Sequence, residues 1–254
     1  MRSAAITFVV LTRNEAPRIG SCLGSVPPDA PVVLYDAQST DETRTIARRR
    51  GADVVVAPWR GFVESRRAAA ALVRTPWTFM LDADERLTPE LAAEIAALEP
   101  PPAVESYSVP RRNVFCGRWV RCAGWWPDRL VRLFRTGQAS LSASPGQLHE
   151  KWSTPGDCID LLSPIEHQSY RSLKEYAQRF GRYTSAEARA MQPSVAKAAL
   201  AWALSPARAL WLLGPRAGLR DGWRGAFIAA ASAAYPAVAA TKALSTRRPP
   251  SRGG

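Results

Sequence analysis

Short apolar runs alternate with amphipathic stretches over the first hundred residues. The apolar runs predict strands at Ala5–Leu11, Pro31–Tyr35, Asp53–Ala57 and Trp77–Leu81. The stretches that follow them predict helices near Pro17, over Ser39–Gly51, over Gly61–Arg74 and from Thr88 onward. Strand and helix in alternation are typical of a parallel sheet covered on both faces. We therefore predict an α/β, Rossmann-like fold with a mostly parallel sheet.

Two of these helices carry clear end signals. Ser39 with Glu42 predicts a capping box at the start of one helix, and Gly51 follows its basic last turn. Thr88 followed by Pro89 predicts the first turn of another. These signals fix where each segment between strands becomes helical.

The alternation stops near Pro100. Ser106–Val109 and Leu130–Phe134 are short strand candidates, and Ser172 predicts a helix start, with Leu173, Tyr176, Phe180 and Tyr183 turned inward. Ser194–Leu244 is Ala-rich and predicts helices interrupted by Pro206, Pro215 and Pro236. The expected organisation is one domain over 1–170 in two halves (1–100 and 101–170), a helical extension over 171–245, and a disordered tail over 246–254.

Charge is divided unevenly along the chain. Residues 1–100 hold 12 basic and 13 acidic side chains, whereas the remaining residues hold 22 and 9. This excess predicts that the second part faces a polyanion, either nucleic acid or an anionic lipid surface. The apolar run Ala226–Ala240 is shorter than the ~20 residues of a membrane span, so an interfacial helix is expected instead.

The cysteines and the N-terminus predict the cellular compartment. The four cysteines lack C-x-x-C spacing, which favours free thiols in a reducing compartment. Met1–Leu11 has one Arg and no small-residue cleavage site, a poor match to a signal peptide. A cytoplasmic location is therefore expected.

Acidic residues follow two of the predicted strands. Asp36 comes after VVLY, and Asp82 and Asp84 come after WTFML. Ligands of an open parallel sheet bind outside the carboxyl ends of its strands, where these acids would meet. Two carboxylates spaced as Asp-X-Asp suit Mg²⁺ or Mn²⁺, which would neutralise a leaving diphosphate. The chain lacks G-x-x-x-x-G-K-[ST] and G-x-G-x-x-G, which argues against a P-loop ATPase or a dinucleotide enzyme.

The ordered motifs of the chain resemble the family-two glycosyltransferases, specifically their lipopolysaccharide-core β-glucosyltransferase-like branch. The matching segments are FVVLTRNEAPRI (8–19), YDAQSTDET (35–43), PWRGFVESR (58–66), LDADERLTPEL (81–91), VPRRNVFCGRWVRCAGWWPDRLVRLFR (109–135), LHE (148–150) and HQSYRSLKEY (167–176). The resemblance implies a GT-A fold, a nucleotide-diphosphate sugar, usually UDP-linked, and inversion at the anomeric carbon. Residues 1–170 would then be the catalytic domain, with the nucleotide-sugar half at 1–100 and the acceptor half at 101–170.

The resemblance also implies roles for residues of the donor site. Thr12, Asn14 and Glu15 would border the nucleoside, Asp36 would face the base, Arg66 would lie near the diphosphate, and Asp82 and Asp84 would serve the ribose and the metal. The family's usual D-S-G-S-T-D-G-T reads DAQSTDET here, so Gln38 and Glu42 replace glycines, and Arg67 stands in place of Asn. These departures bear on base specificity.

Inverting transfer needs a base for the acceptor hydroxyl. Asp128 is the first candidate by position and Glu150 the second, while Trp125 and Trp126 offer flat faces to an acceptor sugar. The alternative is that Asp128 pairs with Arg129 or Arg132 and that the tryptophans are core. His149 or His167 is a candidate to complete the metal shell.

The expected function is transfer of a sugar from a UDP-hexose to a lipid-linked or envelope glycan, such as lipopolysaccharide core. The enzyme would lie on the inner face of a bacterial inner membrane, with no nucleic-acid partner. Two alternatives remain. A sugar nucleotidyltransferase should have a Gly-rich basic loop after the first strand, where this chain has Thr12–Glu15. A non-catalytic basic module would leave Asp82 and Asp84 unexplained.

Overall fold

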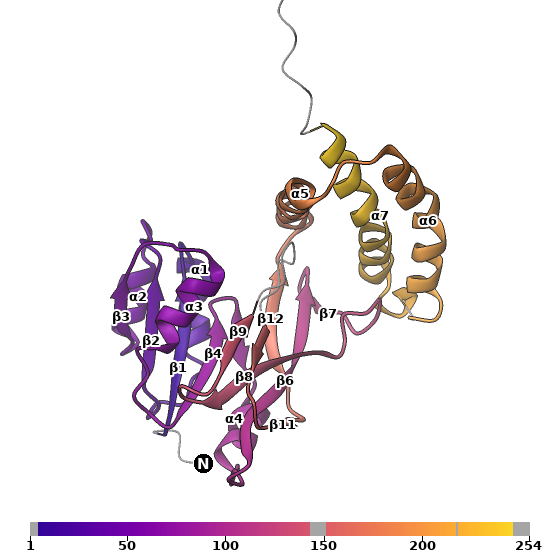
Figure 1. Ribbon diagram of the computed structural model, residues 1–254. Coiled ribbons are helices and arrows are strands. Elements are labelled where there is room, and N and C mark those ends of the chain that lie inside the picture. The colour runs from indigo at the N-terminus through magenta and orange to yellow at the C-terminus, as the bar shows by residue number, and fades with distance from the viewer. Residues whose placement is uncertain (1–4, 143–150, 217, 246–254) are drawn as a thin grey trace, which may run out of the picture. The chain divides into compact units, whose positions relative to one another are not determined.

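The computed structural model describes residues 5–142, 151–216 and 218–245, and these form two compact units. The first unit contains residues 5–112, 128–142 and 151–168. The second contains residues 113–127, 169–216 and 218–245. Figure 1 shows the sheet with its helices and the group formed by α5, α6 and α7.

Four parallel strands form one half of the main sheet. They run in the order β3-β2-β1-β4, with bounds β1 (Ile6–Thr12), β2 (Val32–Asp36), β3 (Asp53–Val56) and β4 (Trp77–Asp82). Thr12 pairs with Asp36 and Leu11 with Asp82, so the carboxyl ends of three strands lie side by side.

The other half of the sheet is largely antiparallel. Beyond β4 the order is β8 (Asp128–Arg135), β6 (Val104–Phe115), β12 (Ile165–Tyr170) and β5 (Glu85–Leu87). Two further strands pair with β6: β11 (Asp157–Asp160), in parallel, and β7 (Arg118–Trp119), antiparallel. A separate pair consists of β9 (Ser140–Ser142) and β10 (Lys151–Ser153). Strands β6 and β12 each contribute residues to both units.

Helices cover both faces of the parallel strands. They are α1 (Ala16–Leu23), α2 (Thr43–Arg49), α3 (Phe62–Ala70) and α4 (Pro89–Ala96). Side chains of β1 alternate between the faces, so Phe8 packs in one core cluster with Ile19 of α1, and Val9 packs in another with Ala69 of α3. Phe8 is 1% exposed, and burial of such a side chain contributes about 2–3 kcal/mol. The predicted α/β fold is confirmed.

The two end signals had different outcomes. Thr88 caps α4 as predicted, its side chain accepting from the Leu91 amide. The prediction of a capping box at Ser39 is wrong. Helix α2 begins at Thr43, and the side chain of its N-cap residue, Glu42, makes no capping hydrogen bond. The Ser39 hydroxyl instead donates to the Asp36 carboxylate, so the strand-end acid uses the group that would have capped the helix.

Three long helices dominate the second unit. They are α5 (Leu173–Ala190), α6 (Val195–Leu213) and α7 (Trp223–Ser245), with a 3₁₀ helix, η2 (Gly218–Asp221), before α7. Ser172 and Ser194 cap α5 and α6 with their side chains. The expected interruptions at Pro206 and Pro236 are wrong, because both prolines lie inside helices.

Rings pack around Phe115 in the core of the second unit. Phe115 lies 5.7 Å from Tyr176 and 5.7 Å from Phe227, measured between ring centroids. The predicted inward stripe of α5 is therefore correct for Tyr176, which is buried, but wrong for Leu173 and Tyr183, which are 45% and 37% exposed. Tyr176 packs on Phe115, whereas Leu173 and Tyr183 remain open to solvent.

Helix α7 is longer than the apolar run Ala226–Ala240 suggested. It has 23 residues and is, within the described ranges, the one helix long and apolar enough to cross a membrane by length and composition. Its buried positions include Ala229, Ala233 and Ala237, which pack inside the second unit. A core helix passes the same length test, so the helix length itself assigns no membrane role.

Candidate active site

The acids predicted at strand ends lie at one edge of the first unit. Asp36 ends β2 and Asp82 ends β4, on either side of the end of β1, and Asp84 follows two residues after Asp82. The parallel register brings them together, because each strand ends at the same level as its neighbour. This edge is where a ligand of an open α/β sheet binds.

Hydrogen bonds join the loops after β1 and β2. The Asn14 amide donates to Ser39 Oγ at 2.8 Å, and Asn14 Oδ1 accepts from the Thr40 amide at 2.8 Å. The Glu15 amide donates to Thr43 Oγ1 at 2.8 Å. The nucleoside-binding candidates Asn14 and Glu15 are thus held by the segment that carries Asp36.

The Asp36 carboxylate is fully buried beneath these loops. Its two oxygens accept from the Ser39 amide at 2.9 Å and the Ser39 hydroxyl at 2.5 Å, and Arg44 Nε lies 3.8 Å away. Thr12, paired with Asp36 across the sheet, is 5% exposed, and its hydroxyl oxygen is buried without a hydrogen-bond partner in the described part of the chain. An unused polar atom at a strand end is a feature that a bound ligand would satisfy.

Guanidinium groups surround Asp82. Arg66 Nη2 lies 2.7 Å from Asp82 Oδ1 and Arg132 Nη2 lies 2.8 Å from Oδ2. Burial opposes ionisation of this carboxyl, but Arg132 and Arg66 outweigh it and hold the pKa of Asp82 well below its usual range. Asp82 is therefore an anion with an arginine on each oxygen.

Glu85 is a site residue that the sequence reasoning missed. It is fully buried, accepts from Arg132 Nη2 and from the Asp82 amide at 3.0 Å, and lies 3.8 Å from Arg111 Nη1. Burial raises the pKa of Glu85, against the pull of Arg132. Its position directly after the Asp-X-Asp motif was the only sign of Glu85 in the sequence. Its partner Arg132 lies 47 positions further on, so the sequence did not show the pair.

Asp84 and His167 face each other. His167 Nε2 lies 3.5 Å from Asp84 Oδ2, because β12 pairs with β5 and the Gln168 amide donates to the Asp84 carbonyl. Two ligands of one octahedral Mg²⁺ or Mn²⁺ lie about 3 Å apart, since each lies about 2.1 Å from the ion. This pair fits such an ion, whereas both oxygens of Asp82 are engaged by arginines.

The described residues contain no group of three or more His, Cys, Asp or Glu side chains that could hold a metal. A divalent cation at Asp84 and His167 would take diphosphate oxygens and water among its other ligands. His149 and Glu150, the other candidates for the metal and the base, lie outside the described residues.

Asp128 starts β8 and forms an ion pair. Arg111 donates to its Oδ2 from Nε at 2.9 Å and Nη2 at 2.5 Å. The alternative pairing of Asp128 with Arg129 or Arg132 is not the one that forms, because Arg129 lies near Asp160 and Arg132 binds Asp82 and Glu85. The Asp128 side chain is 30% exposed.

The two tryptophans before Asp128 belong to the second unit. Trp125 packs against Phe115, with centroids 6.0 Å apart, and Trp126 packs edge-on against Trp119 at 5.0 Å. Both tryptophans are only partly buried. Their role as acceptor-binding faces stays a prediction.

Comparison with known proteins defines the family. Residues 7–149 match the family model of Glycosyl transferase family 2. The chain belongs to this family. An uncharacterized glycosyltransferase of Rickettsia bellii is 42% identical over 91 residues, which is 35% of this chain and 31% of that protein. One from Mycobacterium tuberculosis, Rv0539, is 33% identical over 99 residues, or 37% of this chain and 45% of the relative. The aligned region thus spans less than half the length of these relatives.

A solved structure shares the fold. The mannosyltransferase PcManGT from Pyrobaculum calidifontis, in complex with GDP-Man and Mn²⁺, is 19% identical with a TM-score of 0.50. The alignment covers 96% of this chain and 88% of that one. At this identity the likeness establishes a GT-A-like fold.

Proposed function

We propose that this protein is a metal-dependent, inverting glycosyltransferase that uses a nucleotide-diphosphate sugar. The observation that carries the proposal is the meeting of Asp36, Asp82 and Asp84 at the carboxyl ends of parallel strands, inside the 7–149 family match. A nucleotidyltransferase shares such a sheet but needs a basic Gly-rich loop after the first strand. A basic binding module does not need this acidic edge.

The donor is proposed to be a UDP-hexose. Thr12, Asn14, Glu15 and Asp36 would form the nucleoside side of the site, since the loops that carry them are hydrogen-bonded together. PcManGT was solved with GDP-Man, so guanine is the base that competes with uracil in this proposal. The loss of both family glycines, at Gln38 and Glu42, lies in this same loop.

The proposed chemistry assigns distinct tasks to the charged side chains. Arg66 and Arg132 keep Asp82 ionised and hold its carboxylate in one orientation at the donor site. A divalent cation held by Asp84 and His167 would neutralise the leaving diphosphate. The acceptor hydroxyl oxygen bonds to the anomeric carbon as the bond to diphosphate breaks, and its proton passes to a carboxylate.

Asp128 is the proposed base. Arg111 holds the carboxylate from two nitrogens through Oδ2, which orients the other oxygen. Glu150 is the second candidate. The acceptor is proposed to be a lipid-linked or envelope glycan such as lipopolysaccharide core, reached from the cytoplasmic face of the inner membrane, and the basic second part of the chain supports this.

A donor panel tests the proposal. Purified full chain with Mn²⁺ would be incubated with UDP-, GDP-, ADP- and TDP-hexoses, and release of the nucleoside diphosphate would be measured. We expect UDP-hexose to be hydrolysed slowly without an acceptor, and faster with a glycolipid acceptor. Release of pyrophosphate from a sugar 1-phosphate and a nucleoside triphosphate would instead identify a nucleotidyltransferase. Binding of none of the donors by calorimetry would overturn the proposal.

A further inference from the structure

Helix α6 exposes most of its large apolar residues to solvent, which is unusual for a water-soluble helix. Its inward positions, seven residues apart, are Ala198, Ser205 and Leu212, and Ser205 donates to the Ala233 carbonyl of α7 at 3.0 Å. Six of its large apolar side chains are exposed, namely Val195, Leu200, Trp202, Leu204, Leu210 and Trp211. Leu210 is 69% exposed and Leu200 59%. A contiguous exposed face of this kind marks an interaction surface.

Charge on this part of the chain has one sign. Residues 191–245 contain six basic side chains and a single acid, Asp221. Asp221 Oδ2 already accepts from the backbone amides of Arg121 at 2.9 Å and Cys122 at 2.8 Å. Even with this carboxylate counted, six basic side chains against one acid leave the segment with a net charge of +5.

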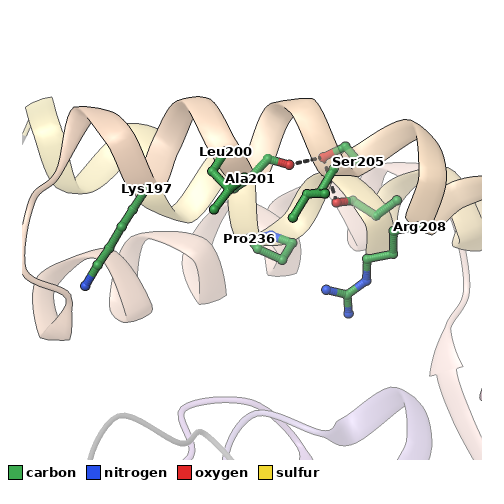
Figure 2. Close-up of a pocket in the computed structure, with 8 residues that line it drawn as sticks. Lys197, Leu200, Ala201, Ser205, Arg208 and Pro236 are labelled. Atoms are coloured by element: carbon green, nitrogen blue, oxygen red, sulfur yellow. Dashed lines mark hydrogen bonds between the residues drawn. The ribbon is translucent and has the colours of Figure 1, made fainter.

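A groove runs between α6 and α7. Its volume is about 260 Å³, and Leu200, Leu204 and Pro236 line it. Lys197 and Arg208 extend from α6 on the same side of this groove (Figure 2). They stand 11 residues apart, about 16 Å along the helix, with the leucines between them. Cations at both ends of an apolar groove match the phosphates and the acyl chains of a lipid surface.

We propose that α6 docks in the interface of an anionic bilayer, with Leu200, Leu204, Leu210 and Trp211 among the acyl chains and Lys197 and Arg208 at the phosphates. Tryptophan favours this depth, because its ring is apolar and its N–H is polar. A second copy of the chain fits this face less well, since a two-fold contact centred on the groove would bring Lys197 of one copy near Arg208 of the other, which places like charges together.

Exposure and contacts decide which aromatic and basic side chains of α6 and α7 belong to the docking surface. Trp202, Trp211 and Trp223 remain 49%, 48% and 52% exposed. Phe227 instead packs on Phe115, and Arg224 donates to the Cys116 carbonyl at 2.9 Å. The docking surface is therefore α6 and its flanks, and excludes Phe227 and Arg224.

Flotation with vesicles tests the proposal. The full chain would be mixed with vesicles of phosphatidylcholine containing 30% phosphatidylglycerol, or of phosphatidylcholine alone, at low and high salt. We expect flotation with the anionic vesicles at low salt and a loss of binding at high salt, because the charge contribution is screened. Failure to float with anionic vesicles at low salt would overturn the proposal, whatever the result of the donor panel.

Matched variants locate the surface. L200E/L204E should weaken vesicle partitioning by at least about tenfold, because it places carboxylates among acyl chains. The control is L162E, at a leucine of the first unit that is 82% exposed, and its partitioning should be unchanged. K197Q/R208Q should weaken partitioning roughly 30-fold, while R48Q/R49Q, at exposed arginines of α2, should change it far less.

Depth and competing partners are tested separately. Brominated phosphatidylcholine mixed into the anionic vesicles should quench tryptophan fluorescence, and W202F/W211F should lose most of this quenching. Circular dichroism on each variant confirms that it is folded. Dimers by light scattering that L200E/L204E converts to monomers, with vesicle binding unaltered, would assign the face to a second copy of the chain and overturn lipid docking.

Discussion

His167 Nε2 lies 3.5 Å from Asp84 Oδ2, although 83 residues separate them in the chain. The pairing of β12 with β5 produces this contact. If the pair holds Mn²⁺, Asp84→Asn should lower transfer by more than about 100-fold at fixed metal, since metal catalysis contributes several kcal/mol. A Mn²⁺ titration of donor turnover measures this effect. Asp53→Asn, at an exposed acid that starts β3, is the control, and full turnover in excess EDTA would reject the metal role.

The buried ion pair between Arg132 and Glu85 should stabilise the fold. Arg132 is 2% exposed and Glu85 is fully buried, so Arg132→Met removes the guanidinium nearest to Glu85 and leaves the buried carboxylate with the more distant Arg111, 3.8 Å away. We expect a loss of about 3–5 kcal/mol in the free energy of unfolding, measured with urea. Arg86→Gln, which breaks the more exposed pair with Glu166, should cost less than about 1 kcal/mol. Equal losses for the two variants would contradict this reading.

Asp128→Asn should separate acceptor activation from donor binding. If Asp128 is the general base, the variant should lower the transfer rate by about 10²–10⁴-fold. The donor affinity, measured by calorimetry, should be unchanged. Slow hydrolysis of the donor should also persist. Asp160→Asn, at a carboxylate that is 62% exposed, is the control. If Asp128→Asn transfers normally and Glu150→Gln does not, the base is Glu150.

Gln38 adopts a left-handed backbone with φ of 58°, at a position where the family pattern has glycine. This conformation costs a non-glycine residue about 1–2 kcal/mol, and glycine gains more entropy on unfolding, so Gln38→Gly should stabilise the protein by about 0.5 kcal/mol. Thermal unfolding tests the sign. Gln138→Gly, at an exposed glutamine outside the left-handed region, should destabilise it instead.

Glu94 of α4 should make stability depend on pH. Its carboxylate accepts from the Leu162 and Ser163 amides at 2.8 and 2.7 Å, and these bonds outweigh burial and lower the pKa of Glu94. A lowered folded-state pKa means that this stabilisation is present above the unfolded value of 4.5 and is lost as pH falls through the folded value. Glu94→Ala should cost about 1–3 kcal/mol at pH 7 and less at pH 3. A loss independent of pH would show that Glu94 acts only by packing.

Local patterns predicted the parallel strands β1 to β4 and the helices between them well, because each carries its own periodicity, but they did not predict β5 or β9 to β12 of the same unit. The capping box at Ser39 failed for a physical reason. The hydroxyl of Ser39 can accept and donate, and the buried carboxylate of Asp36 is the stronger partner. Sequence spacing alone does not reveal such competition.

The arginines of the site were harder to foresee. Arg132 and Arg111 are ordinary basic residues of a basic segment, and only the antiparallel pairing of β8 with β4 and β6 brings them to Asp82, Glu85 and Asp128. Long-range register determines these contacts. The outward leucines of α6 were missed for a similar reason, because helical composition does not show which face packs on α7.

The hydrogen bonds from Asn14 to Ser39 and Thr40 hold the loops after β1 and β2 together, so that neither loop can change its conformation alone. Exchange of donor preference between relatives should then require transplanting both loops together. A graft of residues 37–43 alone would place foreign partners opposite Asn14 and Glu15, and would lose affinity for either nucleotide. A chimera of this enzyme should therefore exchange both loops at once.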